Sequence, residues 1–236
     1  MTIVATFAVM SEFAPWRRLR AFGRVDRGRP IYQTRIGDAD VFAVITGIGM
    51  RNVNGQFEDL LRKPADVCIA SGLAGGLKRE YRAGTVLVAR AVKTSSTQET
   101  VNTVERLVRI GIQCGATPVD SLQSVDVVLT SSLDRQRLAV AADAVDIESF
   151  RVITEALRCG VPAVAIRAVS DPVEKDVPLD FNQAINEQGA INWVSTLFQA
   201  AKTPRRLPEM LRFGRDSLRA ARNLAFFLDR YVTEIS

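Results

Sequence analysis

The sequence predicts an α/β fold, in which a single three-layer domain holds a central mixed β-sheet flanked by helices, with a helical extension at the C-terminus. The run Val161–Pro172 consists of small and β-branched apolar residues, which is typical of a strand buried on both faces. The preceding segment, Asp146–Arg158, has apolar residues along one helical face and leads directly into that run. A chain of 236 residues that is 47% hydrophobic is long enough for one such domain.

The other expected strands are short apolar runs bounded by turn residues. The pair Gly37-Asp38 is typical of a hairpin turn between two of them. These strands are expected at Thr2–Val9, Ile31–Ile36, Val41–Thr46, Val67–Ala70, Gly84–Val92 and, in broken form, Pro118–Leu129.

Helices and loops are expected between the strands. The helix Asp146–Arg158 has the clearest signals, because Asp146 can cap its N-terminus and Gly160 lies just beyond its end. Glu148 falls in its first turn. The other helices are expected at Pro15–Phe22, Asn52–Arg62, Glu99–Cys114 and Arg135–Ala142, with loops at Met10–Glu12 and Ser71–Gly76.

Composition excludes several classes of function. The chain has no histidine, which removes Ser-His-Asp hydrolysis, Cys-His proteolysis and His-ligated zinc, and no metal site is predicted. Most of the net charge of +5 lies beyond Lys202, so the body is nearly neutral and nucleic acid is not an expected partner. The odd number of cysteines, without metal-ligand spacing, favours reduced thiols and a cytoplasmic protein, and Met1–Met10 is interpreted as a strand rather than a leader.

The end of the strand Val161–Pro172 is the expected site. Ligands of open α/β sheets bind beyond the C-terminal ends of the strands, where Asp171 lies. Alternatively, Asp171 is only a turn residue before Pro172. Glu148, which opens the preceding helix, is expected to face the same pocket.

Two glycine-rich segments allow a ligand to approach the backbone closely. Thr46–Gly49 contains Gly47 and Gly49, but the third glycine of a dinucleotide fingerprint is replaced by Asn52. Ser71–Gly76 either contacts a ligand or simply turns the chain.

Four motifs in this order resemble the purine nucleoside phosphorylase and methylthioadenosine/S-adenosylhomocysteine nucleosidase superfamily: Thr46–Gly49, Ser71–Leu77, Val145–Ser149 and Arg167–Asp171. The resemblance implies a nucleoside phosphorylase-like fold and cleavage of the N-glycosidic bond of a purine nucleoside, with adenine the expected base and no cofactor. It further implies that Asp171, beside Ser170, gives a proton to the purine, that Glu148 holds the ribose hydroxyls and that Ile147 packs under the sugar. The remaining candidate substrate-binding residues are Gly47, Gly49, Leu73, Ala74, Gly75, Val127 and Val128; for the two valines, a plain hydrophobic strand is an equally good account.

The choice between water and phosphate is left open by the sequence. Where the phosphorylases place Arg and Ser or Thr for phosphate, this chain has Ala70 and Leu73. Hydrolytic relatives use a Glu after the first strand to activate water, and Glu12 lies one position short of the expected place. Glu12 is therefore the candidate general base, with phosphate as an alternative co-substrate. Arg167, inside an apolar strand, is expected to have a structural role.

The division expected is a domain at 1–201 and a basic amphipathic helical tail at 202–236. Apolar residues from Leu207 to Val232 recur at helical spacing with arginines on other faces. The tail is expected to pack on the body or on a second subunit, or to lie on an anionic membrane surface. The insertion between Val92 and Pro118 is shorter than in relatives. In these two features, the tail and the short insertion, the chain resembles the hopanoid-associated branch of the superfamily, which acts on a lipid-linked adenosine. The resemblance also implies a homo-oligomer, with a dimer favoured; the alternative function is a catalytically silent nucleoside-binding or sensor module.

Overall fold

A computed structural model describes residues 1–25, 30–51, 55–62, 65–174, 176–178, 189 and 204–236 of the chain. Its strands are β1 (Thr2–Phe7), β2 (Gly23–Arg24), β3 (Ile31–Ile36), β4 (Ala39–Ile45), β5 (Val67–Gly76), β6 (Val86–Thr94), β7 (Thr100–Asn102), β8 (Thr117–Ser124), β9 (Ala144–Asp146) and β10 (Ala163–Asp171). Its helices are α1 (Met10–Arg20), α2 (Gln56–Arg62), α3 (Glu105–Gln113), α4 (Ser132–Leu138), α5 (Ser149–Arg158) and α8 (Leu207–Ile235), with short 3₁₀ turns at Ile48–Met50 and Pro204–Arg206.

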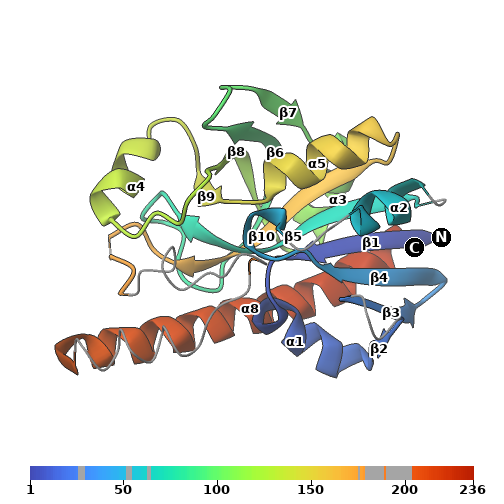
Figure 1. The fold of residues 1–236 in the computed structure, drawn as a ribbon, viewed down its shortest axis with the longest axis horizontal. Helices are drawn as coiled ribbons and strands as arrows, with labels where there is room; N and C mark the ends of the chain where they lie inside the picture. The colour runs from blue at the N-terminus through green and yellow to red at the C-terminus, as the bar shows by residue number, and fades with distance from the viewer. Residues whose placement is uncertain (26–29, 52–54, 63–64, 175, 179–188, 190–203) are drawn as a thin grey trace.

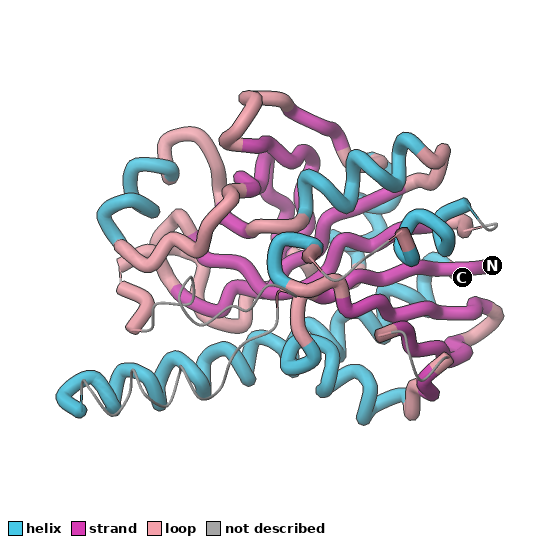
Figure 2. Tube along the Cα trace, viewed as in Figure 1, coloured by secondary structure: helices cyan, strands magenta, loops and turns pink. Residues whose placement is uncertain are grey.

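The predicted α/β fold with a mixed sheet is confirmed. The strands form one sheet in the order β10-β6-β8-β9-β5-β1-β4-β3-β2, and β10 also pairs with β5. β1 runs parallel to both β4 and β5, and β10 runs parallel to β5, whereas β6 runs antiparallel to β10. The extra pairing closes β10, β6, β8, β9 and β5 into a ring, and the tube in Figure 2 shows these strands grouped together.

Helices cover both faces of the sheet, which gives the three expected layers. Side chains of α1, α3 and α8 form one hydrophobic core with the sheet, and side chains of α2 and α5 form the other. Figure 1 shows α8 and α1 below the sheet and α5 above it. The N-terminal half of α8 extends past the sheet, so only residues from Ala220 onwards are buried in the core.

Three predicted boundaries were wrong for local reasons. Met10–Glu12 is the first turn of α1 rather than a loop, because the Glu12 carboxylate accepts the N–H of Ala8 at 2.9 Å and so caps the helix. Ser71–Gly76 is not a loop but the second half of β5, which continues to pair with β10 as far as Gly75. Thr100–Asn102 is a strand paired with β6, so the predicted helix begins only at Glu105.

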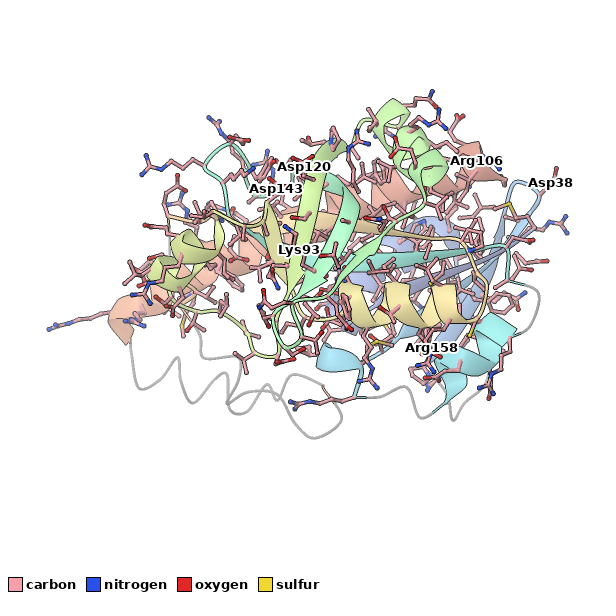
Figure 3. The ribbon with its side chains drawn as sticks, turned by 90° about the horizontal axis from the view of Figure 1, so that it is seen from above. Asp38, Lys93, Arg106, Asp120, Asp143 and Arg158 are labelled. Atoms are coloured by element: carbon pink, nitrogen blue, oxygen red, sulfur yellow. The ribbon has the colours of Figure 1, made fainter. Side chains whose placement is uncertain are left out.

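The helix predicted at Asp146–Arg158 begins at Ser149 in the structure, three residues later than predicted. Asp146 ends β9, and its carboxylate still accepts the N–H of Ser149, the first residue of α5. Glu148 is therefore the residue immediately before the helix rather than part of its first turn. The preceding Asp143 anchors the start of β9 to β8, because it accepts the N–H of Asp120 at 2.9 Å (Figure 3).

Two other predictions fall partly or wholly outside the described residues. The helix expected at Asn52–Arg62 is described only from Gln56. The boundary at residue 201 lies in the range 190–203, which the structure does not describe. The division into a domain and a tail stays a prediction. Among the described residues, no helix is long and apolar enough to cross a membrane.

Candidate active site

A cavity of about 600 Å³ lies at the ends of β1, β5 and β10, which is a normal size for a small-molecule site. Four carboxyl groups line it: Asp146, which is paired with Arg167, and Glu12, Glu148 and Asp171. The predicted convergence of Glu148 and Asp171 on one hollow is therefore present in the structure. The predicted site residues that line the cavity are Glu12, Leu73, Ala74, Gly75, Val127, Val128, Ile147, Glu148, Ser170 and Asp171.

Gly47 and Gly49 are not among the lining residues, although Ile48 between them is. Gly49 acts through its backbone instead, because its N–H donates to the Glu148 carboxylate at 3.0 Å. Both glycines have positive φ angles, of 72° and 69°, which other residues rarely adopt. The glycine-rich segment thus orients Glu148 rather than forming part of the cavity wall.

The Glu12 carboxylate is held by backbone donors from two elements. It accepts the N–H groups of Ala8 and Val9 just ahead of it, and that of Leu73 on β5 at 3.1 Å. Burial raises the pKa of Glu12, and the nearby Arg167 guanidinium and these backbone donors oppose that rise. The carboxylate is thereby fixed at the cavity wall in one orientation.

Glu148 lies beside the buried side chain of Arg167, with 3.6 Å between a carboxylate oxygen and a guanidinium nitrogen. Burial raises the pKa of Glu148 to about 7; Arg167 opposes the rise, and the Asp146 and Glu12 carboxylates add to it. A carboxyl group with this pKa changes its charge near neutral pH, so ligands that donate hydrogen bonds to its ionised form bind with a pH dependence.

The buried side chain of Arg167 contacts an acidic and a polar partner besides Glu148. It pairs with Asp146 at 2.7 Å and donates from Nε to the Ser149 hydroxyl at 3.0 Å. A side chain at Gly72 would start 2.5 Å from a guanidinium nitrogen of Arg167 and 3.0 Å from the Glu12 carboxylate. Position 72 must therefore be glycine, because any side chain there would occupy the space that the Arg167 guanidinium and the Glu12 carboxylate take up beside β5.

Asp171 lies at the end of β10, as predicted, with both carboxylate oxygens in contact with other side chains. One oxygen accepts the Ser170 hydroxyl and the other pairs with Arg135, a fully buried arginine of α4. Burial raises the pKa of Asp171, while Arg135 and the Ser170 hydroxyl oppose the rise. Because Asp171 and Arg135 both line the cavity, this ion pair faces the hollow rather than closing it off.

Sequence reasoning missed two parts of the site. Arg135 was placed in a short helix without any role. The other omission is the N-terminal half of α8, which forms an apolar wall of the cavity. Its lining residues are Leu207, Met210, Leu211, Phe213, Gly214, Ser217 and Leu218.

Residues 3–103 match the family model described as the phosphorylase superfamily. No curated protein matches it at a significant level. Among the described residues, no group of three or more acidic or cysteine side chains could hold a metal ion.

Solved structures with low sequence identity to this chain share its fold. One is a 5′-methylthioadenosine/S-adenosylhomocysteine nucleosidase of Campylobacter jejuni, with a TM-score of 0.73, 15% identity and 99% of each chain covered. Another is the futalosine hydrolase of Helicobacter pylori, with a TM-score of 0.73, 17% identity, and 99% of this chain and 98% of that chain covered. This coverage includes the C-terminal helix α8.

The raised pKa of Glu148 predicts a stability that depends on pH. Between pH 4.5 and 7 the folded protein keeps a proton that an unfolded Glu has lost, so the free energy of unfolding falls as pH rises through this window. Glu148→Gln removes this contribution, which is on the order of 3 kcal/mol. Denaturant unfolding of both proteins at pH 4.5 and 7.5 measures it. Equal pH slopes for the two proteins would contradict it.

Proposed function

We propose that the protein is an enzyme that cleaves the N-glycosidic bond of a purine nucleoside, with adenine as the released base. The observation that carries the proposal is the presence of Glu12, Glu148 and Asp171 on one cavity. The similar structures support it, because they are those of a methylthioadenosine/S-adenosylhomocysteine nucleosidase and a futalosine hydrolase.

The three carboxyl groups match the charges that develop in this reaction. As the bond breaks, the ribose gains positive charge and the base gains negative charge. A protonated Asp171 supplies a proton to the base, and burial favours its protonated form. An ionised Glu148 accepts hydrogen bonds from the ribose hydroxyls and stabilises the positive sugar. Carboxyl groups and water are sufficient for these steps, so the proposed reaction needs no cofactor.

Water is the proposed nucleophile. Glu12 lies at the cavity wall, where it can take a proton from water as the new bond to the sugar forms. Arg135 and Arg167 are the buried arginines among the described residues, and each is already paired with a carboxylate. A phosphate dianion would have to compete with those carboxylates, so this arrangement favours hydrolysis over phosphorolysis.

The proposed substrate carries a bulky apolar group at its 5′ position, and a lipid-linked, hopanoid-type nucleoside fits this description. The wall formed by α8 supports this, because it is lined by Leu207, Met210, Leu211 and Phe213. Residues 207–221 of a helix span about 20 Å, which gives room for an extended chain beside the carboxyl groups. Release of adenine from nucleosides with progressively longer 5′ alkylthio groups tests the proposal. Equal or falling rates with chain length would contradict it.

The same half of α8 is proposed to contact an anionic membrane surface at the inner face of the cell membrane. Leu211 is 68% exposed, and the exposed arginines Arg212 and Arg215 lie near it on the same helix. Exposed apolar residues next to arginines are typical of helices that lie on anionic lipid. Sedimentation with vesicles that contain anionic lipid tests this contact, and protein left in the supernatant would contradict it.

Gly214 offers a direct test of the α8 wall. A Cβ atom at this position meets nothing within 4 Å, and Gly214 lines the cavity, so the wall has space for a side chain here. Gly214→Trp is expected to lower kcat/KM for long 5′ groups about tenfold or more, an effect of the size that lost pocket contacts produce. The kcat/KM of this variant for 5′-methylthioadenosine should be nearly unchanged. Gly214→Ala is the matched control, and equal losses on short and long substrates would contradict the prediction.

The proposed homo-oligomer is not needed for any of these roles. A dimer is expected from the superfamily resemblance, and light scattering of the purified protein measures it. A monomer at all concentrations would contradict it.

A further inference from the structure

Arg135 is a fully buried arginine in the wall of the cavity. Its Nη1 pairs with the Asp171 carboxylate and donates to the backbone carbonyl of Pro172 at 3.3 Å. The surrounding wall is apolar and includes Val128, Leu129 and Val177. A charged side chain is thus buried at the one carboxyl group that is expected to face the base.

A purely structural role explains this position poorly. Burying a guanidinium and a carboxylate costs free energy, and apolar residues of similar size often replace such a pair without loss of stability. A link between α4 and the end of β10 does not by itself require a charged pair. The position of the arginine beside Asp171 points to the reaction instead.

The reaction creates a negative charge at Asp171. When the bond between C1′ and N9 breaks, its electron pair passes to the base, and N7 takes the proton of the Asp171 carboxyl group. This transfer leaves a carboxylate in a largely buried site, where a new charge is costly without an adjacent opposite charge. The Arg135 guanidinium is already in contact with that carboxylate. The hydroxyl of the attacking water forms the new bond to C1′, and its other proton goes to Glu12.

We propose that Arg135 is a positioning residue of leaving-group activation: it holds the Asp171 carboxyl group at the base and neutralises the charge that proton transfer leaves there. The inference rests on the proposed nucleosidase function. It adds Arg135, which was not among the site residues predicted from the sequence. It also limits the role of Arg135 to leaving groups that need a proton.

That limit provides the test. Arg135→Met is assayed on an adenine nucleoside and on 4-nitrophenyl riboside, whose nitrophenolate leaves without a proton. The variant is expected to lose about 100-fold in kcat on the nucleoside, in the range of general acid catalysis, and less than about threefold on the aryl riboside. Arg135→Lys keeps a positive charge and is expected to be at least about tenfold faster than Arg135→Met on the nucleoside. Arg137→Met, at an exposed arginine of the same helix, is the control and should behave as wild type.

Three outcomes would overturn the inference. Equal losses on both substrates would show that Arg135 is structural, and unchanged rates on both would show that it has no role. A lysine variant no better than the methionine variant would show that charge is not what matters. If Arg135→Met does not fold, Arg135→Gln gives the same comparison. Wild-type protein that releases no adenine would contradict the proposed function rather than this inference.

Discussion

Asp171→Asn is expected to lower the rate of adenine release by about 10² to 10⁴-fold, the usual contribution of a general acid. Asparagine has nearly the same shape and can still accept a hydrogen bond from Arg135, but it has no acidic proton to give to the base. Steady-state kcat on an adenine nucleoside measures the loss, together with the binding affinity for a non-cleavable analogue, which should change little.

The control for this variant is Asp38→Asn, which makes the same substitution at a side chain that is 94% exposed on a hairpin turn. It should retain the wild-type rate. An Asp171→Asn protein that folds, binds the analogue and still releases adenine at the wild-type rate would show that the carboxyl group is not the acid.

Glu12→Gln is expected to have the second large effect, a loss of about 10² to 10⁴-fold in hydrolysis. Glutamine cannot accept a proton from water at neutral pH, whereas its amide oxygen can still accept one of the backbone N–H groups that hold Glu12. Binding of the analogue should be retained, because Glu12 is proposed to act on water rather than on the nucleoside. Single-turnover measurements separate the two effects.

Ser11→Ala is the matched control, because Ser11 also lines the cavity but has no proposed role in the reaction. Thermal unfolding of Glu12→Gln shows whether the loss of one acceptor at the start of α1 lowers stability. A stable Glu12→Gln protein with wild-type hydrolysis would rule out Glu12 as the base.

The central elements of the fold were predictable because their local signals agree with their surroundings. The apolar run that became β10 is buried along almost its whole length, and its last residue carries the acid that the sequence singled out. Ser71–Gly76 shows the opposite case. Glycine is a poor strand former in isolation, but pairing with β10 overrides this preference and extends β5.

The site was less predictable where burial alone distinguishes two similar residues. Arg135 and Arg137 lie two positions apart in the same polar stretch, yet their side chains are 0% and 72% exposed. Nothing in the local pattern separates them. Likewise, helical spacing predicted α8 and its apolar stripe, but not that the part of the helix before Ala220 extends past the sheet and forms a wall of the cavity.

The most direct test is product analysis with the purified protein in buffer free of phosphate. Adenine and reducing sugar are measured over time with a 5′-substituted adenine nucleoside. The two products are expected to form in equal amounts and at a rate that added phosphate does not raise. A nucleoside that binds in a one-to-one ratio and stays intact, or adenine released only when phosphate is present, would contradict it.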